Sequence, residues 1–336
     1  MIKKITYKLL LFFTLVLAIH YVYLYTLYPS DLKKYSPLLV QCKTLSKDVS
    51  VIYFGESSNT AYAEKDSLKQ TISEMVAGMI PKKKMATIDT FAVHAGIYKE
   101  WLKSLNPKGK ECVIVTLNLR SFGAAWIHSK IESNLNKSVR LSETPYAGIN
   151  RLLLALRMPA DQTPLQCDRQ IINDWRNEKL PFKSPFSYKT TKEWDDGYYK
   201  KLKNNGASHK DSARIILACH YIKAFAFTIH DNNPRVKDFD EIAAWSAKNN
   251  VKVYFNILAE NIHYADSLVG KELVYLMRQN RDYLIKRYKA KNIEMIDNLE
   301  AIESKYFIDK NWTTEHYTDK GRMIIARNIV EHLKLK

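Results

Sequence analysis

Short apolar runs that alternate with helix-like segments are the feature that most constrains the fold of this chain. Three such runs occur between residues 51 and 119, and two more follow towards the C-terminus. Alternation of strand and helix at this spacing predicts a parallel sheet with helices on both faces. We therefore expect a three-layer α/β sandwich whose five parallel strands lie near residues 51–55, 86–90, 112–118, 252–258 and 292–296.

The helices between these strands are predicted from apolar residues that recur at helical spacing. They cover residues 67–79, 94–102, 267–289 and 323–335. Between residues 124 and 249 the alternation stops, and the chain is largely helical and rich in aromatics and lysine, with a loop-rich crossing at 159–188. We interpret 124–249 as an insertion that covers the carboxyl edge of the sheet.

The N-terminus carries a segment long and apolar enough to cross a membrane. Residues 9–28 have no formal charge apart from a titratable His20, and twenty such residues match the thickness of a bilayer core. Lysines precede the segment and tyrosines crowd its far end, which predicts a cytoplasmic N-terminus and an exported body. A cleaved signal peptide is the alternative, although no small-x-small site follows. The expected organisation is an anchor at 1–30 and one domain at 31–336.

Charge and cysteine content exclude several classes of protein. The chain has 52 basic and 35 acidic residues, a net charge of +17, but the lysines are dispersed and no nucleic-acid-binding motif occurs. An anionic membrane or an acidic polymer remains as a partner for such a charge. The four cysteines lack metal-type spacing, and Cys42 with Cys167 is the pair that could form a disulfide in an oxidising compartment. We expect neither a metal nor a cofactor.

The first predicted strand ends in Gly55-Glu56-Ser57, followed by polar residues. A serine at the carboxyl end of a parallel strand, facing a helix N-terminus, is well placed for a nucleophile, because backbone N–H groups converge there. The alternative is that residues 57–60 only cap a helix.

Three further residues fall where this chemistry needs them. A serine nucleophile requires a general base, and the tetrahedral oxyanion requires preorganised donors such as a backbone N–H and a side-chain amide. His316 precedes the last predicted helix and is the candidate base. Gly96, at a loop-to-helix start, and Asn118, at the end of the third strand, are the candidate oxyanion donors.

These blocks resemble the SGNH or GDSL superfamily of serine esterases and acyltransferases. Gly55-Glu56-Ser57 is similar to its Gly-Asp-Ser block, with Glu in place of Asp. The stretch from His316 to Gly321 is similar to the His-Trp-Thr-x-x-Gly ending of membrane-anchored relatives of the alginate O-acetylation and teichoic-acid D-alanylation type. The resemblance implies a flavodoxin-like sandwich with Ser57 as nucleophile, His316 as base, and Gly96 and Asn118 as oxyanion donors. It covers residues 51–119 and 251–334 and leaves the insertion unexplained.

The acidic member of the site departs from that pattern. The family places an aspartate two or three residues before the histidine, where this chain has Thr313 and Thr314. The nearest acids are Glu315 and Asp309, of which Glu315 is our predicted third member, with a Ser–His dyad as the alternative.

Two functions follow from these residues. The first is an extracytoplasmic, membrane-anchored serine esterase or O-acyltransferase that acts on O-acyl groups, expected to be acetyl, of a cell-envelope glycan. The second is a non-catalytic, SGNH-like glycan-binding or envelope-assembly protein, supported by the missing aspartate. The expected partners are the membrane, an acylated glycan and envelope-assembly proteins, with no nucleic acid.

Overall fold

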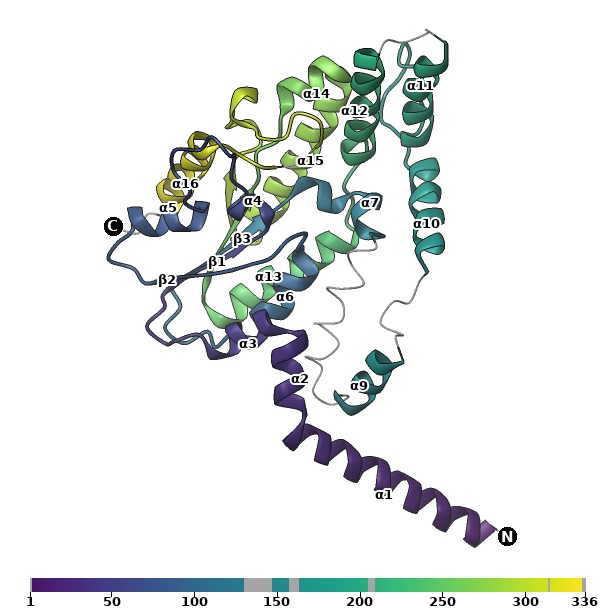
Figure 1. Ribbon diagram of the computed structural model, residues 1–336, viewed down its shortest axis with the longest axis vertical. Helices are drawn as coiled ribbons and strands as arrows, with labels where there is room; N and C mark the ends of the chain where they lie inside the picture. The colour runs from purple at the N-terminus through teal and green to yellow at the C-terminus, as the bar shows by residue number, and fades with distance from the viewer. Residues whose placement is uncertain (1, 130–146, 157–162, 205–208, 314, 334–336) are drawn as a thin grey trace.

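The computed structural model describes residues 2–129, 147–156, 163–204, 209–313 and 315–333. Its centre is a five-stranded parallel sheet in the order β2-β1-β3-β4-β5 (Figure 1). The strands are β1 (Val51–Gly55), β2 (Met85–Asp89), β3 (Cys112–Leu117), β4 (Lys252–Ile257) and β5 (Glu294–Asp297). The predicted sandwich and its five strands are thus confirmed, with strand bounds shifted by one or two residues.

Helices cover both faces of the sheet because the strand side chains alternate between two apolar cores. Ile52 and Phe54 of β1 face a core with α3 (Pro37–Thr44), α6 (Ala95–Ser104), α13 (Pro234–Asn249) and α15 (Lys271–Lys289). Val51 and Tyr53 face the opposite core, with α5 (Ile72–Met79) and α16 (Asp319–Leu333). This alternation, with period two, is what a strand buried on both sides requires.

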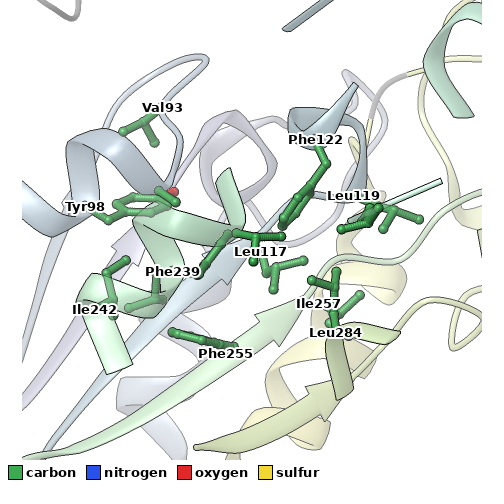
Figure 2. Close-up of a cluster of buried hydrophobic side chains, with 14 of the residues drawn as sticks. Val93, Tyr98, Leu117, Leu119, Phe122, Phe239, Ile242, Phe255, Ile257 and Leu284 are labelled. Carbon is green, nitrogen blue, oxygen red and sulfur yellow. The ribbon is translucent and has the colours of Figure 1, made fainter. Parts of the chain in front are cut away.

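Aromatic packing holds the larger core together. Phe239 of α13 lies edge-to-face on Phe255 of β4, with ring centroids 4.8 Å apart, and stacks on Phe122, at 5.7 Å (Figure 2). All three side chains are almost completely buried. The helix α13 is therefore part of the sandwich itself, which corrects the prediction that residues 124–249 are an insertion throughout.

The rest of the predicted insertion is largely helical where the structure describes it, and it packs partly on the larger core and partly on α1. It contains α7 (Ala124–Ile127), α9 (Ala147–Ala155), α10 (Pro164–Asn177), α11 (Thr191–Asn204) and α12 (His209–Phe225). The loop-rich crossing predicted at 159–188 is wrong in part, because Thr163 and Gln166 form a capping box that starts α10. In this region, 130–146, 157–162 and 205–208 lie outside the described residues.

Two other predicted helix bounds differ for local reasons. The single helix predicted at 267–289 is divided into α14 (Ile262–Leu268) and α15, because Gly270 adopts a φ of +124° that ends one helix and precedes the next. The helix predicted from 67 begins at Ile72, where Thr71 and Glu74 make a capping box.

The N-terminal segment forms α1 (Ile2–Thr26), a helix of suitable length and composition to cross a membrane and with its apolar side chains exposed. It continues into α2 (Tyr28–Tyr35), then α3. The buried Leu32, Leu39 and Cys42 pack these helices against the larger core, so residues 31–47 are a packed part of the domain rather than a polar connector. Cys42 forms no disulfide with Cys167, contrary to the pairing we considered.

Candidate active site

The switch in strand order places β1 and β3 side by side with their carboxyl ends at one edge of the sheet. Connections leave β1 and β3 towards opposite faces, and this is where open α/β sheets form ligand sites. Ser57 follows β1 as the first residue of the short helix α4 (Ser57–Thr60), and Asn118 follows β3. The site that we predicted from Ser57 and Asn118 is therefore located at the switch point.

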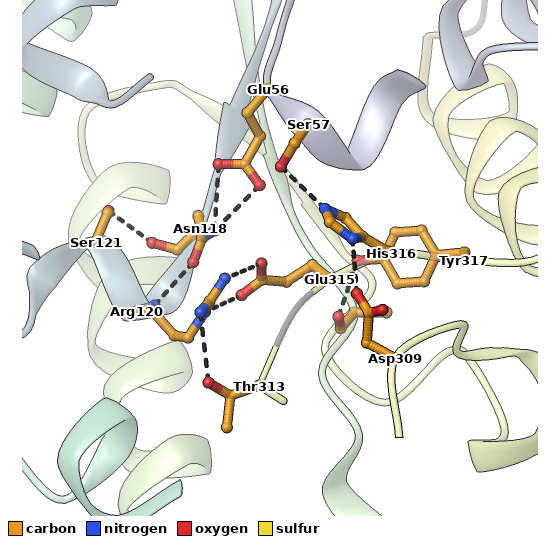
Figure 3. A network of polar contacts seen from close by, with 11 residues as sticks. Glu56, Ser57, Asn118, Arg120, Ser121, Asp309, Thr313, Glu315, His316 and Tyr317 are labelled. Carbon is orange, nitrogen blue, oxygen red and sulfur yellow. Dashed lines mark hydrogen bonds and ion pairs between the residues drawn. The ribbon is translucent and has the colours of Figure 1, made fainter. Parts of the chain in front are cut away.

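Ser57 and His316 are in hydrogen-bonding contact although 259 residues separate them. The Oγ atom of Ser57 lies 3.1 Å from Nε2 of His316, and Nδ1 of His316 lies 2.7 Å from Oδ2 of Asp309 (Figure 3). An Nδ1–H that donates to the carboxylate leaves Nε2 as the acceptor for the serine hydroxyl. Both histidine and aspartate side chains are partly exposed, so a substrate can reach them.

An antiparallel turn of chain explains why the acid is Asp309. Phe307 and Tyr317 form an antiparallel bridge, and the N–H of Ile308 donates to the carbonyl of His316 at 2.9 Å. This pairing folds the segment back on itself and brings Asp309 opposite His316. The carbonyl of Ala259 accepts a hydrogen bond from the Tyr317 hydroxyl at 2.9 Å, which fixes the turn to the end of β4.

The predicted role of Glu315 as the orienting acid is wrong. Its carboxylate turns to the other side, where it pairs with both Nε and Nη2 of Arg120 (Figure 3). Neighbours in an extended segment point to opposite sides, which is why the residue next to His316 cannot orient it. Thr313 is buried beside the same guanidinium, and Thr314 lies outside the described residues.

Asn118 is connected to the residue before Ser57 through hydrogen bonds to Glu56. Its Nδ2 donates to both carboxylate oxygens of Glu56, at 3.1 and 3.2 Å, and its Oδ1 accepts from the backbone N–H of Arg120 at 3.0 Å. Glu56 directly precedes Ser57 and is buried. An amide nitrogen carries two hydrogens, so Asn118 retains donor capacity at the same edge of the sheet.

The predicted role of Gly96 does not agree with the structure. Its backbone N–H donates to Nδ1 of His94, the N-cap of α6, at 3.1 Å. A Cβ at this position would lie 2.9 Å from the His94 ring and 3.0 Å from Asp238 of α13. The glycine therefore allows close packing of α6 on α13, and its N–H is engaged in helix capping rather than at an oxyanion.

A buried charge cluster, formed by Glu56, Arg120, Glu260 and Glu315, lies beneath the site. Burial, together with the charge of Glu315, raises the pKa of Glu56 to about 8 and the pKa of Glu260 well above its usual value. Burial alone would lower the pKa of Arg120, but the charge of Glu315 and its hydrogen bonds raise it. One guanidinium thus faces three buried carboxyl groups, and the cheapest way to reduce the repulsion is to keep protons on Glu56 and Glu260.

Sequence reasoning missed the residues that hold α4 in place. The buried Asn59 donates to Oδ2 of Asp89, at the end of β2, at 2.6 Å and accepts from the N–H of Ser73 at 2.9 Å. These bonds attach the helix that begins with Ser57 to a neighbouring strand and to α5. The polar run 56–60 was visible in the sequence, but nothing there distinguished Asn59 from a solvent-exposed cap.

The insertion reaches the segment that carries Asp309 and His316 through an aromatic contact. The ring of His220, on α12, lies 4.1 Å from the ring of Trp312, which stands between Asp309 and His316 in the chain. Half of Trp312 is exposed. A cavity of about 320 Å³ lies further along, lined by Phe122, Trp175, Glu178 and Phe227 among others, and Ser57 is not part of its lining.

No metal-binding group of His, Cys, Asp and Glu occurs within the described part of the chain. His94 is buried as a helix cap, and His230 and His263 are exposed.

Among known proteins, the chain is similar to several solved structures. No protein-family model matches the sequence, and no curated protein does. One similar structure is an acetyl-xylooligosaccharide esterase, Axe2, from Geobacillus stearothermophilus, with 8% identity over 87% of this chain and 97% of that one and a TM-score of 0.37. Another is a protein assigned as an acylhydrolase from Bacteroides fragilis, with 10% identity over 89% and 93% and a TM-score of 0.32. At these values, neither structure supports a function for this chain, and the function proposed below rests on the chain's own sequence and geometry.

Proposed function

We propose that this chain is a serine esterase or O-acyltransferase that acts through an acyl-enzyme on Ser57. The observation that carries the proposal is the hydrogen-bonded series from Ser57 Oγ to His316 Nε2 and from His316 Nδ1 to Asp309. These three groups come from two distant parts of the chain and meet in the order that a nucleophile, base and orienting acid require.

The reaction follows from the roles of these atoms. The Oγ of Ser57 attacks the acyl carbonyl carbon while Nε2 of His316 takes its proton, and the carbonyl oxygen becomes an oxyanion. The backbone N–H of Ser57 and the free amide hydrogen of Asn118 are the donors proposed for that oxyanion. Collapse expels the alcohol oxygen, which receives the proton from His316. Water or a sugar hydroxyl then attacks the acyl-serine by the same route in reverse.

The location and substrate complete the proposal. The α1 helix would anchor the protein in a membrane with its C-terminal domain outside the cytoplasm, because lysines precede the span. The resemblance of the Ser57 and His316 blocks to membrane-anchored SGNH proteins supports an O-acetylated glycan of the cell envelope as substrate. The net charge of +17 is compatible with an anionic polymer.

A non-catalytic glycan-binding or envelope-assembly protein is the second candidate. The observation in its favour is the engagement of the Gly96 N–H by His94, which leaves the site without one of the donors that the resemblance implies. The complete Ser57–His316–Asp309 series favours the enzyme, because decay of function removes selection for such geometry.

The deciding experiment measures acetate release from an activated acetyl ester by the full chain in detergent. Ser57→Ala should lower the rate by several orders of magnitude, because only binding and the oxyanion donors remain. Ser58→Ala is the matched control, since Ser58 is a buried neighbour in the same helix. Equal rates for wild type and Ser57→Ala would refute the assignment. Addition of a sugar acceptor that speeds release of the ester's alcohol while lowering release of acetate would identify a transferase, because the acetyl group then passes from Ser57 to the sugar instead of to water.

A further inference from the structure

The helix α9 carries an apolar stripe that faces away from the protein. Ile149 and Leu152, together with Leu156 just beyond its end, are exposed by 54%, 59% and 59%. Positions three and seven residues apart lie on one face of a helix. Three large aliphatic side chains on one solvent-facing stripe indicate a partner that covers them.

Polar residues of α9 hold it to the protein. Asn150 is buried, and the Nε of Arg151 pairs with Oδ2 of Asp31 in α2 at 2.6 Å. The guanidinium of Arg151 also lies over the ring of Tyr35, 5.7 Å from its centroid. A surface helix of a soluble protein keeps its large apolar side chains on the inward face, whereas three of those at α9 face outward. Outward apolar side chains on a helix that is fixed by polar contacts are typical of a helix with apolar surroundings.

The position of α9 identifies those surroundings. It packs against α1 (Figure 1), and Gly148 approaches so closely that a Cβ there would lie 3.0 Å from Nδ1 of His20. His20 is the one histidine of residues 9–28, which contain no Asp, Glu, Lys or Arg, and Gly148 of α9 lies against one side of it. Exposure of a polar side chain to lipid costs free energy. Because α9 shields His20 on one side, that cost is lower when α1 crosses the membrane next to α9.

The part of α1 that α9 contacts also carries exposed apolar and aromatic side chains. The nearby Tyr21, Val22 and Tyr25 of α1 are exposed by 54%, 62% and 78%. Tyrosines of this kind gather where the bilayer core meets the headgroups. Lys33 and Lys34, which follow in α2, are exposed and carry charge of the sign that anionic headgroups attract.

We propose that α9 is an interfacial helix, which rests on the lipid surface that α1 crosses and inserts Ile149, Leu152 and Leu156 at the boundary between headgroups and acyl chains. The occupant of this surface is the bilayer itself. The proposal rests on the membrane location proposed for α1, but not on the chemistry at Ser57. In this proposal the chain contacts the membrane twice, through α1, which crosses it, and through α9, which lies parallel to its surface.

Site-specific labelling of the full chain in vesicles of phosphatidylcholine and phosphatidylglycerol tests the proposal. Leu152→Cys, in a Cys167→Ser background, is labelled with an environment-sensitive fluorophore, and spin-labelled lipids with the label near the headgroup serve as quencher. Ile149→Cys and Leu156→Cys repeat the measurement, so that one poorly folding variant does not decide it. Ile216→Cys is the matched control, because Ile216 is an aliphatic side chain, 45% exposed, on α12.

The expected result is that the α9 labels lose most of their emission to the lipid quencher while the label at 216 keeps its emission. Equal, weak quenching at all three α9 positions and at 216 would overturn the proposal. Leu15→Cys, in the middle of α1, separates this failure from a wrong anchor assignment. Quenching of a label at 15 by a deep lipid spin label, with none at α9, refutes the interfacial helix alone. No quenching at 15 refutes the membrane span and with it the proposal for α9. Acetate release measured on the same samples reports separately on the site.

Discussion

The carboxylate of Asp309 accepts a hydrogen bond from His316 at 2.7 Å, and seven residues of a folded-back segment separate the two. The bridge between Phe307 and Tyr317 creates this contact, and a spacing rule based on two or three residues misses it. If Asp309 fixes the imidazole tautomer, its loss should affect the rate far more than the affinity for substrate.

Asp309→Asn should lower kcat on an acetyl ester on the order of 10² to 10⁴-fold, because the amide stabilises the wrong imidazole tautomer and no longer balances its charge. Initial-rate assays with purified wild type and Asp309→Asn measure kcat for both proteins. Glu315→Gln is the comparison, and activity per folded molecule should fall much less. A larger loss of kcat in Glu315→Gln than in Asp309→Asn would reverse our assignment of the acid.

The buried ion pair between Arg120 and Glu315 should dominate the stability of the site. Arg120→Met should lower the free energy of unfolding by about 3–5 kcal/mol, because it leaves an uncompensated buried carboxylate. Arg120→Met combined with Glu315→Met should cost less than Arg120→Met alone. Urea unfolding measures both variants against the wild type, and Lys84→Met, which breaks an exposed pair with Asp48, should cost far less than Arg120→Met because solvent screens that pair. A double variant that is less stable than Arg120→Met would contradict the argument.

Stability should fall with rising pH through the titration of Glu56. Its pKa is raised in the folded protein from 4.5 to about 8, so the folded state holds more protons than the unfolded state between these values. The contribution is complete below about 4.5 and is lost as the pH rises towards 8, with a slope of up to about 1.4 kcal/mol per pH unit. Glu56→Gln retains an acceptor for Asn118 and should flatten this dependence in urea unfolding at pH values across that range. An unchanged slope would show that Glu56 is ionised in the folded state.

Asn118 and Gly96 should respond differently to substitution. Asn118→Ala should lower kcat about 10² to 10³-fold if its amide donates to the oxyanion. Gly96→Ala should leave kcat of the folded protein nearly unchanged but lower the free energy of unfolding by about 1–3 kcal/mol, because the added methyl meets His94 and Asp238. Parallel activity and unfolding measurements on both variants test the distinction. A selective loss of kcat in Gly96→Ala would restore the oxyanion role that we assign elsewhere.

The orientation in the membrane can be tested with a fused enzyme. Alkaline phosphatase, joined after Lys336, should be active because the domain is expected outside the cytoplasm. The same fusion without residues 1–30 should be inactive, since α1 is the single candidate span in the described part of the chain. Activity of a cytoplasmic reporter at the same position would refute the proposed localisation.

The sequence predicted the sheet well because strand burial leaves a strong local signal. Val51 to Phe54 and Cys112 to Val115 are uninterrupted apolar runs of the kind that a strand covered on both faces needs. The places of Ser57 and Asn118 followed from their positions at the carboxyl ends of predicted parallel strands, which lie at one edge of a sheet, and that of His316 from the resemblance of its block. These positions depend on topology more than on side-chain detail.

The remaining parts of the site depend on contacts that no local pattern encodes. Asp309 reaches His316 through a tertiary turn, and Gly96 is engaged by a histidine two residues before it. Similarly, α13 belongs to the core because Phe239 meets Phe255, although its sequence position suggested an insertion. Each of these contacts appears only in the folded structure, so none of them could be predicted from the sequence near either residue.

If α1 spans a membrane as proposed, the junction of α1 and α2 determines how the domain is held relative to that membrane. The hydroxyl of Tyr23 donates to Asp31 at 3.1 Å, and the same carboxylate binds Arg151. These contacts connect α1, α2 and α9 into a rigid junction, in place of a flexible linker. A domain tethered by a flexible linker samples all positions within reach of that linker above the membrane. A rigidly held domain would present Ser57 at a constant height and orientation above the membrane. For the proposed activity on an envelope glycan, the polymer would have to reach that height, and the thickness of the surrounding envelope would then contribute to selectivity.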